Sequence, residues 1–395
     1  MLYGTEEDVK RAEGKIISWR RWFHANPELR DNTVMTEARI SEALKDMGIS
    51  DVLTGVGGSG VVATIRGGLP GKCLAIRADC DGLPIREETG LPFASVNGSM
   101  HACGHDAHMA MALGAAEVLR KHRDEIKGSV KLVFQPYEEG GRGAQRMIAD
   151  GALRSPDADA IIALHIGNIM GMGYDSGDVV VSPKHTSACI YGFKATFHGK
   201  GTHVCTPHLG IDPVFMACSA VVEIQSLLSR EKDPLEAAVI GVCMIHGGSR
   251  NNSIPDECSI EGSIRSFSRE VHERYCRRFR EICRSVAEGL RGTVDFETVT
   301  EVPSTKIDPD LYRRFLEVAG TVVPPDRLKI QEHAPLMGED FAYFSDEVPA
   351  LYFYVCSKPV EGECFPHHHP KFDIDEAQMI RGTALLSEFA LHWQD

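Results

Sequence analysis

The sequence predicts an α/β protein with helices on both faces of its sheet and a smaller α+β domain inserted into the chain. Three observations predict this class. Amphipathic helices alternate with short apolar strands in the first part of the chain. A β-α-β-β-α-β order follows, which is typical of a ferredoxin-like sandwich. The length of 395 residues also exceeds what a single hydrophobic core usually supports, so two domains are expected.

The first domain is expected to begin with two amphipathic helices. Residues 5–25 carry Ile16, Trp19 and Phe23 on one helical stripe, and Thr36–Met47 repeats the pattern. The elements expected next are the strands Val61–Ile65 and Cys73–Ala78, a helix from Asp106 to about Lys121, the strand Val130–Phe134, a short helix Arg142–Ala149 and the apolar strand Ala158–His165.

The pattern changes after about residue 183, where the inserted domain is expected to begin. Its predicted elements are the strand Ala188–His198, the helix Pro213–Leu228, the strands Ala238–His246 and Cys258–Ser266, the helix Val271–Leu290 and the strand Thr293–Thr298. The chain then returns to the first domain with the helix Asp308–Ala319, the strand Ala350–Val355 and the helix Glu376–His392. The predicted division is therefore a first domain made of 1–183 and 302–395, and an inserted domain of 184–301.

The composition excludes some classes of function. The chain has 42 Lys and Arg against 56 Asp and Glu, a net charge of −14. This balance argues against nucleic-acid binding, because no surplus of cations is available to replace phosphate counterions. No run of about 18 apolar residues occurs, so no membrane span is expected. Met1–Lys15 lacks the apolar stretch of a signal peptide, so a cytoplasmic protein is expected.

Twelve cysteines and 17 histidines are the least ordinary part of the composition. In a reducing cytoplasm the thiols are expected to stay free, and most should be small buried side chains. Those in apolar strands or helices are expected in or near the core: Cys73, Cys189, Cys218, Cys243, Cys276, Cys283 and Cys356.

The densest group of metal-binding side chains is the segment HACGHDAH, residues 101–108. Thiolate and imidazole together suit zinc or another first-row metal. Cys103 and His105 are two residues apart, and in an extended segment that spacing turns both side chains to one face. The alternative is a loop of buried, hydrogen-bonded histidines. A zinc finger is excluded, because no Cys-x-x-Cys pair occurs.

Glu138 and Glu139 follow the apolar strand Lys131–Phe134, at the strand end where open α/β sheets place their sites. Adjacent carboxylates repel each other unless a cation divides their roles, so that one ligates and the other takes a proton. The alternative is an ordinary acidic pair on the surface.

Further candidate ligands stand at other strand ends. His165 closes a strand, where a histidine is also a common polar cap, and the run His367–His369 could lie on the surface. Asp79 and Asp81 follow a strand as ligands or as groups that orient a ligating histidine, although an Asp-Gly turn explains them equally. Together these residues are numerous enough to bind two metal ions.

The inserted domain carries three further candidates. His203 follows a glycine-rich segment, GKGT, whose backbone can approach a ligand closely, and its ring can donate a hydrogen bond to an oxyanion. A hairpin turn with a solvated histidine is the alternative. Asn252 and Arg265 lie on the same domain, where a buried arginine can hold a substrate carboxylate with two hydrogen bonds.

With these residues in view, the sequence resembles the dinuclear-metal amidohydrolases and metallopeptidases that include hippurate hydrolase, the indole-3-acetyl-amino-acid hydrolases and the p-aminobenzoyl-glutamate hydrolases. This family is distantly related to aminoacylase and the glutamate carboxypeptidases. The matching segments occur in order over nearly the whole chain: RRWFHANPEL (20–29), RADCDGLP (77–84), MHACGHDAHMAMALGAA (100–116), FQPYEEGGRGAQRMI (134–148), ALHIG (163–167), GKGTHVCTPHLGIDP (199–213), SIPDECSIEGSIRSF (253–267), MGEDFAYF (337–344) and HHPKFDIDE (368–376).

The resemblance implies a zinc-peptidase-like mixed-sheet catalytic domain with an inserted lid and dimerisation domain. It also assigns roles residue by residue. Glu138 matches the general base, Asp81 a carboxylate that supports the metal site, and His203 the lid histidine. Asn252 and Arg265 match lid positions near the substrate. The positions that match the family's metal ligands are Cys103, His105, Glu139, His165 and His368.

The implied activity is metal-dependent hydrolysis of the amide bond of N-acyl amino acids, which releases a carboxylic acid and an amino acid. The implied cofactor is a pair of divalent ions, and cysteine with histidine ligands tolerates zinc, manganese, cobalt or nickel. The segments HHHPKFDIDE and RGAQRMI most resemble the p-aminobenzoyl-glutamate branch of the family, which implies an aromatic acyl group, as in hippurate or p-aminobenzoyl-glutamate. A homodimer through the lid is also implied, in which the lid histidine of relatives can reach the active site of the partner.

Some positions depart from the family pattern. Thr202, Val204 and Cys205 surround His203 where the family often has Gly and two Ala, and Cys80 stands where Met is usual. Two other functions remain possible on this resemblance: a dipeptidase or aminopeptidase on the same scaffold, and a non-catalytic metal-binding relative. The presence of Glu138 argues against the second, because metal storage needs no free base.

Overall fold

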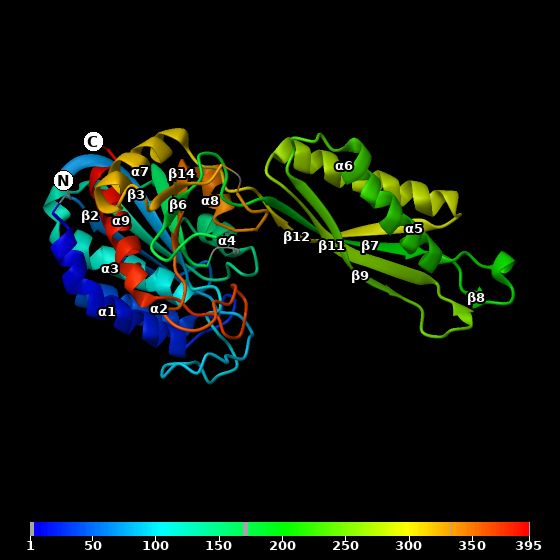
Figure 1. The fold of residues 1–395 in the computed structure, drawn as a ribbon, viewed down its shortest axis with the longest axis horizontal. Coiled ribbons are helices and arrows are strands. Elements are labelled where there is room, and N and C mark those ends of the chain that lie inside the picture. The colour runs from blue at the N-terminus through cyan, green and yellow to red at the C-terminus, as the bar shows by residue number, and fades with distance from the viewer. Residues whose placement is uncertain (1–3, 169–172, 333, 395) are drawn as a thin grey trace. The chain divides into compact units, whose positions relative to one another are not determined.

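The computed structural model describes residues 4–168, 173–332 and 334–394, which pack as two units (Figure 1). The large unit comprises Met1–Thr186, Thr305–Ala334 and Asp340–Asp395, and the small unit comprises Ser187–Ser304 and Pro335–Glu339. Each unit has its own hydrophobic core. The predicted boundaries between the catalytic domain and the inserted domain, at 183/184 and 301/302, stay a prediction.

An eight-stranded mixed sheet forms the centre of the large unit, with the strand order β1-β2-β4-β3-β5-β14-β6-β13. β4, β3, β5 and β14 run parallel, whereas β1, β2 and β6 pair antiparallel with neighbours. The predicted α/β class is thereby confirmed. The strands are β1 (Val52–Val56), β2 (Gly60–Arg66), β3 (Leu69–Asp79), β4 (Lys127–Gln135), β5 (Ala160–Gly167), β6 (Val179–Val181), β13 (Leu328–Ile330) and β14 (Ala350–Cys356).

Helices cover this sheet, and three of them, α1, α3 and α9, pack against one another. Every residue of β5 and β14 is buried. Because successive side chains of a strand point to opposite faces, both faces of the sheet's centre are covered. The helices are α1 (Glu6–Ala25), α2 (Val34–Asp46), α3 (His105–Lys121), α4 (Gly143–Ala149), α7 (Pro309–Val322), α8 (Ala342–Glu347) and α9 (Met379–His392).

The small unit is an antiparallel sheet of order β12-β7-β11-β9 packed against two helices, α5 and α6. Along the chain its main elements follow the predicted β-α-β-β-α-β order. Asp212 caps α5 by accepting hydrogen bonds from the backbone N–H groups of Val214 and Phe215, which fixes where this helix begins. The elements are β7 (Cys189–His198), β8 (Thr202–His203), α5 (Pro213–Ser226), β9 (Ala238–Gly247), β10 (Ser253–Ile254), β11 (Glu257–Ser266), α6 (Arg269–Gly289) and β12 (Thr293–Val302).

Some predicted details are wrong. Cys218 and Cys243 are exposed rather than in the core, because Cys218 lies off the buried stripe of α5 and Cys243 lies on the edge strand β9. The last helix begins at Met379, since Glu376–Gln378 forms a 3-10 turn. The apolar pattern also missed β1, β6 and β13, each of which has five residues or fewer. None of the helices in the described ranges has the length and apolar character that a bilayer crossing requires.

Helix α1 buries a charged histidine. His24 is 1% exposed, and its Nδ1 and Nε2 lie 2.8 and 3.0 Å from carboxylate oxygens of Asp106 and Glu87. Burial alone would lower the pKa of His24, but hydrogen bonds to the two carboxylates outweigh it and raise that pKa to about 9. Both ring nitrogens therefore donate, and the imidazolium is the stable form near neutral pH.

The stability of the protein should depend on pH through His24. Its pKa is about 9 in the fold against an ordinary value of 6.5, so the stabilisation is complete below pH 6.5 and is lost as the pH rises through 9. The shift corresponds to roughly 3 kcal/mol of unfolding free energy. Urea denaturation between pH 6 and pH 10 should show this decline in the wild type and a smaller decline in His24→Asn. Equal declines in both proteins would contradict the assignment.

Candidate functional site

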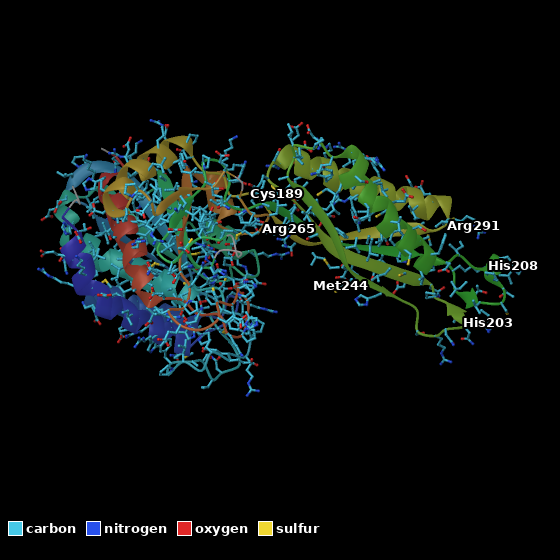
Figure 2. The ribbon with its side chains drawn as sticks, in the orientation of Figure 1. Cys189, His203, His208, Met244, Arg265 and Arg291 are labelled. Carbon is cyan, nitrogen blue, oxygen red and sulfur yellow. The ribbon has the colours of Figure 1, made fainter. Side chains whose placement is uncertain are left out.

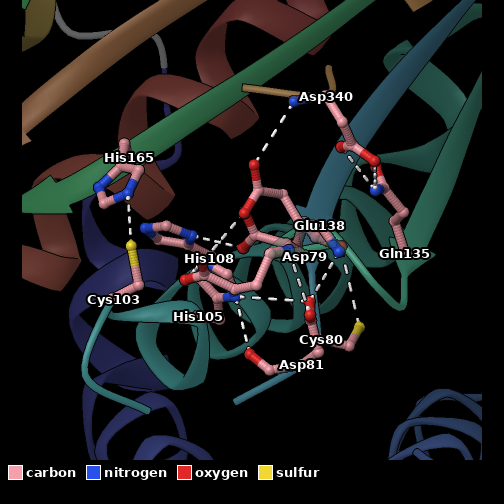
Figure 3. Close-up of polar contacts among 12 residues, drawn as sticks. Asp79, Cys80, Asp81, Cys103, His105, His108, Gln135, Glu138, His165 and Asp340 are labelled. Atoms are coloured by element: carbon pink, nitrogen blue, oxygen red, sulfur yellow. Dashed lines mark hydrogen bonds and ion pairs between the residues drawn. The ribbon is translucent and has the colours of Figure 1, made fainter. Parts of the chain in front are cut away.

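The candidate side chains gather where three parallel strands end (Figure 3). β3, β4 and β5 run in the same direction, so their carboxyl ends lie at one edge of the sheet. Asp79 is the last residue of β3, Glu138 and Glu139 follow β4, and His165 stands near the end of β5. This is the edge at which open α/β sheets place their ligands.

The loop that enters α3 brings a thiol and an imidazole to the same edge. Cys103 and His105 flank Gly104, which has a φ of 84°. A Cβ atom at Gly104 would lie 3.2 Å from Cγ2 of Ile166, so glycine permits this loop to approach β5 closely. Cys103 Sγ lies 3.4 Å from Nε2 of His165.

All five predicted metal ligands come together in two groups that share one residue. Cys103, His105 and His165 form one group, and Cys103, Glu139 and His368 form the other. Within each group the possible ligand atoms lie within 4.8 Å of one another. The donors are a thiol, imidazoles and a carboxylate, which suit borderline cations such as zinc. The arrangement therefore fits two divalent cations, and Cys103 belongs to both candidate groups.

Two of the imidazoles are oriented as metal ligands usually are. His105 Nδ1 donates to the backbone carbonyl of Asp81 at 2.8 Å, and His165 Nδ1 donates to the carbonyl of Ile166 at 2.9 Å. A carbonyl only accepts, so Nδ1 carries a hydrogen, and in a neutral ring the lone pair is then on Nε2. Burial holds the pKa of His165 well below its usual value, which keeps this ring neutral.

Glu139 provides a direct test of whether a cation fits. Its Oε1 lies 3.2 Å from Nε2 of His368 and 4.0 Å from Nε2 of His105. The same oxygen is buried and accepts no hydrogen bond of acceptable geometry. Burial alone would raise the pKa of Glu139, but His368 and His105 outweigh it and lower that pKa. An ionised, buried oxygen without a hydrogen bond calls for a positive charge beside it.

The three consecutive histidines make different contacts. His367 Nε2 donates to the carbonyl of Ile166 at 3.0 Å, and the His369 ring stacks on Phe365 with 4.4 Å between ring centroids. His368 therefore is the member that faces Glu139. Its φ of 64° is in the left-handed region that favours glycine, and such strained residues concentrate at functional sites.

Asp81 holds the two adjacent glutamates in place. Its Oδ1 accepts from the backbone N–H of Glu138 at 2.9 Å, and its Oδ2 accepts from that of Glu139 at 3.2 Å. Tyr137, the residue before them, has a φ of 63°. Burial, followed by the nearby Glu139, raises the pKa of Asp81 well above its usual value. Asp81 thus supports the turn that presents Glu138.

A buried network around the predicted candidate Asp79 adjoins the ligands, and sequence reasoning assigned no role to its other members, Arg77, His108 and Asp340. His108 Nδ1 lies 2.6 Å from Asp79 Oδ1, and its Nε2 accepts from the backbone N–H of Ile166 at 2.9 Å. Arg77 donates to Asp79 at 2.9 Å and to Asp340 at 3.1 Å, and the backbone N–H of Asp340 donates to Glu138 Oε1 at 3.4 Å. His108 lies three residues after His105, on the same face of α3. That spacing is the one sequence signal that would have placed His108 beside His105.

The three predicted lid residues belong to the small unit. Figure 2 labels two of them, His203 and Arg265. His203 is exposed on β8, and its Nδ1 accepts from the backbone N–H of Cys205 at 3.2 Å, so a neutral ring carries its hydrogen on Nε2. The carbonyl of the exposed Asn252 accepts from the N–H of Val204 at 3.0 Å. Arg265, on β11, is half-buried and donates to the carbonyl of Leu336 at 2.8 Å.

Comparison with known families decides the relationship. A family described as Peptidase family M20/M25/M40 matches residues 75–392. The chain belongs to this family. The predicted resemblance is thereby confirmed, and with it the M20 architecture of a catalytic domain with an inserted lid domain.

Individual proteins match over nearly the whole chain. Thermostable carboxypeptidase 2 of Saccharolobus solfataricus is 36% identical over 385 residues, which cover 96% of this chain and 95% of the relative. N-acetyl-L-cysteine deacetylase of Bacillus subtilis is also 36% identical, over 97% of this chain and 89% of the relative. The crystal structure of a dinuclear metal-binding M20 peptidase from Bacillus subtilis has a TM-score of 0.83 and 30% identity, over 97% of this chain and 98% of that chain.

Proposed function

We propose that this M20 protein uses two divalent metal ions to hydrolyse the amide bond of small N-acyl amino acids, releasing a carboxylic acid and an amino acid. The observation that carries the proposal is the pair of ligand groups that share Cys103, with the carboxylate of Glu138 beside them. The deacetylase relative, 36% identical, supports an N-acyl amino acid as substrate. The segments HHHPKFDIDE and RGAQRMI favour an aromatic acyl group.

The predicted metal ligands all lie in the large unit, and each has a role in this proposal. Cys103, His105 and His165 would hold one cation, and Cys103, Glu139 and His368 the other: zinc, manganese, cobalt or nickel. Divalent cations at such a site lower the pKa of bound water toward neutrality and polarise a carbonyl oxygen.

Glu138 is the proposed proton carrier. Asp81 fixes its backbone and Asp340 donates to its Oε1, so the carboxylate has a defined position. Glu138 takes a proton from the attacking water and delivers it to the nitrogen of the leaving amine. The same group thus serves as base in the first step and as acid in the second.

The small unit supplies the proposed contacts to the substrate. His203 with its hydrogen on Nε2 suits a donor to the oxyanion that forms on the amide carbonyl. Arg265 uses Nη1 for Leu336 and Nε for Ser263, and the Nη2 side of its guanidinium suits a substrate carboxylate. Asn252 is assigned to the substrate by its place in the family pattern.

A peptidase on the same scaffold is the second candidate, and the identity with a carboxypeptidase favours it. Both reactions break an amide bond with the same groups, so they differ in which acyl group and amine the site accepts. A non-catalytic metal-binding protein is disfavoured, because it would not need Glu138 oriented by Asp81 and Asp340.

We also propose a homodimer formed through the small unit. β9 is an edge strand, and its exposed Met244 and Ile245 help to line an apolar hollow against α5. Phe215 and Val222 on α5 are 59% and 69% exposed. An exposed edge strand beside an apolar helix face is suited to pairing with its own copy about a two-fold axis.

A cytoplasmic location is proposed as well, since all twelve cysteines are free.

A substrate panel tests the function. Metal-reconstituted protein is expected to release the amino acid from N-acetyl, N-benzoyl and N-(p-aminobenzoyl) amino acids, and a chelator should abolish this release. Amino-acid analysis of the products separates the alternatives. Preferred cleavage of unblocked dipeptides would instead support the peptidase, and absence of any hydrolysis by metal-loaded protein would support the non-catalytic relative.

The two adjacent glutamates should respond differently to the same substitution. Glu138→Gln is expected to lower kcat by roughly 10²–10⁴-fold, the usual contribution of a general acid–base group, and to keep both metals. Glu139→Gln should lose metal, because it removes a ligand. Inductively coupled plasma mass spectrometry gives the metal content. Loss of metal from Glu138→Gln in proportion to activity would refute the base assignment.

Light scattering on a sizing column tests the dimer. The wild type should elute with the mass of two chains, and Ile245→Lys on β9 should shift it toward one, because a lysine on an edge strand opposes strand pairing. Val299→Lys is the matched control, since Val299 is 53% exposed on β12 at the opposite edge of the sheet. A dimer that survives Ile245→Lys but not Val299→Lys would move the interface to β12.

A further inference from the structure

Arg20, in the segment RRWFHANPEL of α1, contacts two parts of the metal site without contacting a ligand atom. The side chain is 2% exposed and donates to three carboxylates. Nε lies 3.0 Å from Asp106 Oδ2, Nη2 lies 3.1 Å from Asp373 Oδ1, and Nη1 lies 3.1 Å from Glu376 Oε1. A single guanidinium therefore joins three acidic side chains.

These carboxylates belong to the segments that carry metal ligands. Asp106 directly follows His105 at the beginning of α3, and Asp373 lies in the segment HHPKFDIDE that begins with His368. The two segments are far apart in the sequence. Arg20 links them through rigid geometry, because a planar guanidinium presents its N–H groups in a fixed fork.

The charge of Arg20 is as important as its shape. Burial alone would lower its pKa, but Asp106, Asp373 and Glu376 outweigh burial and raise it, so the group stays charged. Without this cation, three carboxylates would repel one another in a largely buried place. His24 donates to Asp106 as well, at 2.8 Å, but among the described residues it makes no ion pair with Asp373 or Glu376.

We propose that Arg20 is a positioning residue of the metal centre. It holds the α3 segment and the His368 segment at the spacing that lets His105 and His368 approach the same oxygen of Glu139. Arg20 thereby raises the affinity for metal, although it touches no metal ligand itself. The inference rests on the proposed ligand set and not on the identity of the substrate.

Arg21 is a matched control in the next position of the chain. It also binds Glu376, with Nη2 2.6 Å from Oε2, but its side chain is 50% exposed. In the described part of the chain its ion pairs are with Glu376 alone. Replacing Arg21 removes a positive charge from the same neighbourhood and leaves the link between Asp106 and Asp373 intact.

The test measures metal affinity without any substrate. Metal-free protein is titrated with Zn²⁺ in competition with a chromophoric chelator, for the wild type, Arg20→Lys, Arg20→Gln and Arg21→Gln. Groups that position metal ligands typically contribute about 10- to 100-fold to affinity, so both Arg20 variants should bind Zn²⁺ at least about tenfold more weakly. Arg21→Gln should stay near the wild-type affinity. Arg20→Lys is informative because it keeps the positive charge but removes the planar guanidinium with its fixed N–H groups.

A second measurement separates positioning from stability alone. The rise in Tm on adding Zn²⁺ should be smaller for the Arg20 variants, because weaker binding stabilises the folded state less. A lower Tm of the metal-free variants with unchanged Zn²⁺ affinity would overturn the proposal. If the Arg20 variants do not fold, Asp373→Asn removes one partner of Arg20 and should weaken Zn²⁺ binding in the same direction. A wild-type protein that binds no metal would also overturn it, whereas a metal-binding protein without hydrolysis would contradict only the proposed function.

Discussion

The burial of carboxylates around the ends of β3 and β4 and at the beginning of α3 is the constraint on which the large unit depends. An ionised carboxylate away from water is costly unless a cation or several hydrogen bonds compensate it. Arg77 compensates Asp79 and Asp340, whereas Arg20 and His24 compensate Asp106. These ion pairs connect segments that are distant in the sequence, and they fix the positions of the strand ends around the site.

Glu139 differs from these carboxylates in the groups that surround it. The protein's own permanent cations serve the surrounding carboxylates, while Glu139 Oε1 meets imidazole nitrogens and accepts no good hydrogen bond. His105 and His165 commit their Nδ1 hydrogens to backbone carbonyls, so each ring in its neutral form presents the lone pair of Nε2 to the site. Glu139, His368 and the thiol of Cys103 together form a donor group that suits a divalent cation.

Local patterns predicted most of the fold, and the motifs predicted which residues gather at the site. Periodicities of 2 and 3.6 residues located the helices and the longer strands, but they carry no information on strand order, so the edge position of β9 and the exposure of Cys243 escaped prediction. The residue type alone does not distinguish three consecutive histidines, and His368 was predicted from the family pattern; in the structure a backbone φ of 64° turns His368 apart from its neighbours. Partners such as Arg20 with Asp373 arise from tertiary packing. The roles of the lid residues stay predictions.

The same buried charges explain why one thiol among twelve is suited to metal. Cys80 stands between Asp79 and Asp81, in the middle of the site's sequence, and is a plausible ligand by position alone. Burial, Asp79 and Asp81 raise the pKa of Cys80 well above its usual value, so its thiol keeps its proton. Cys103 instead lies 3.4 Å from a nitrogen of His165 and within reach of both ligand groups. Because a thiolate is the form that binds metal, burial beside two carboxylates disfavours Cys80 as a ligand, whereas the position of Cys103 suits it to that role.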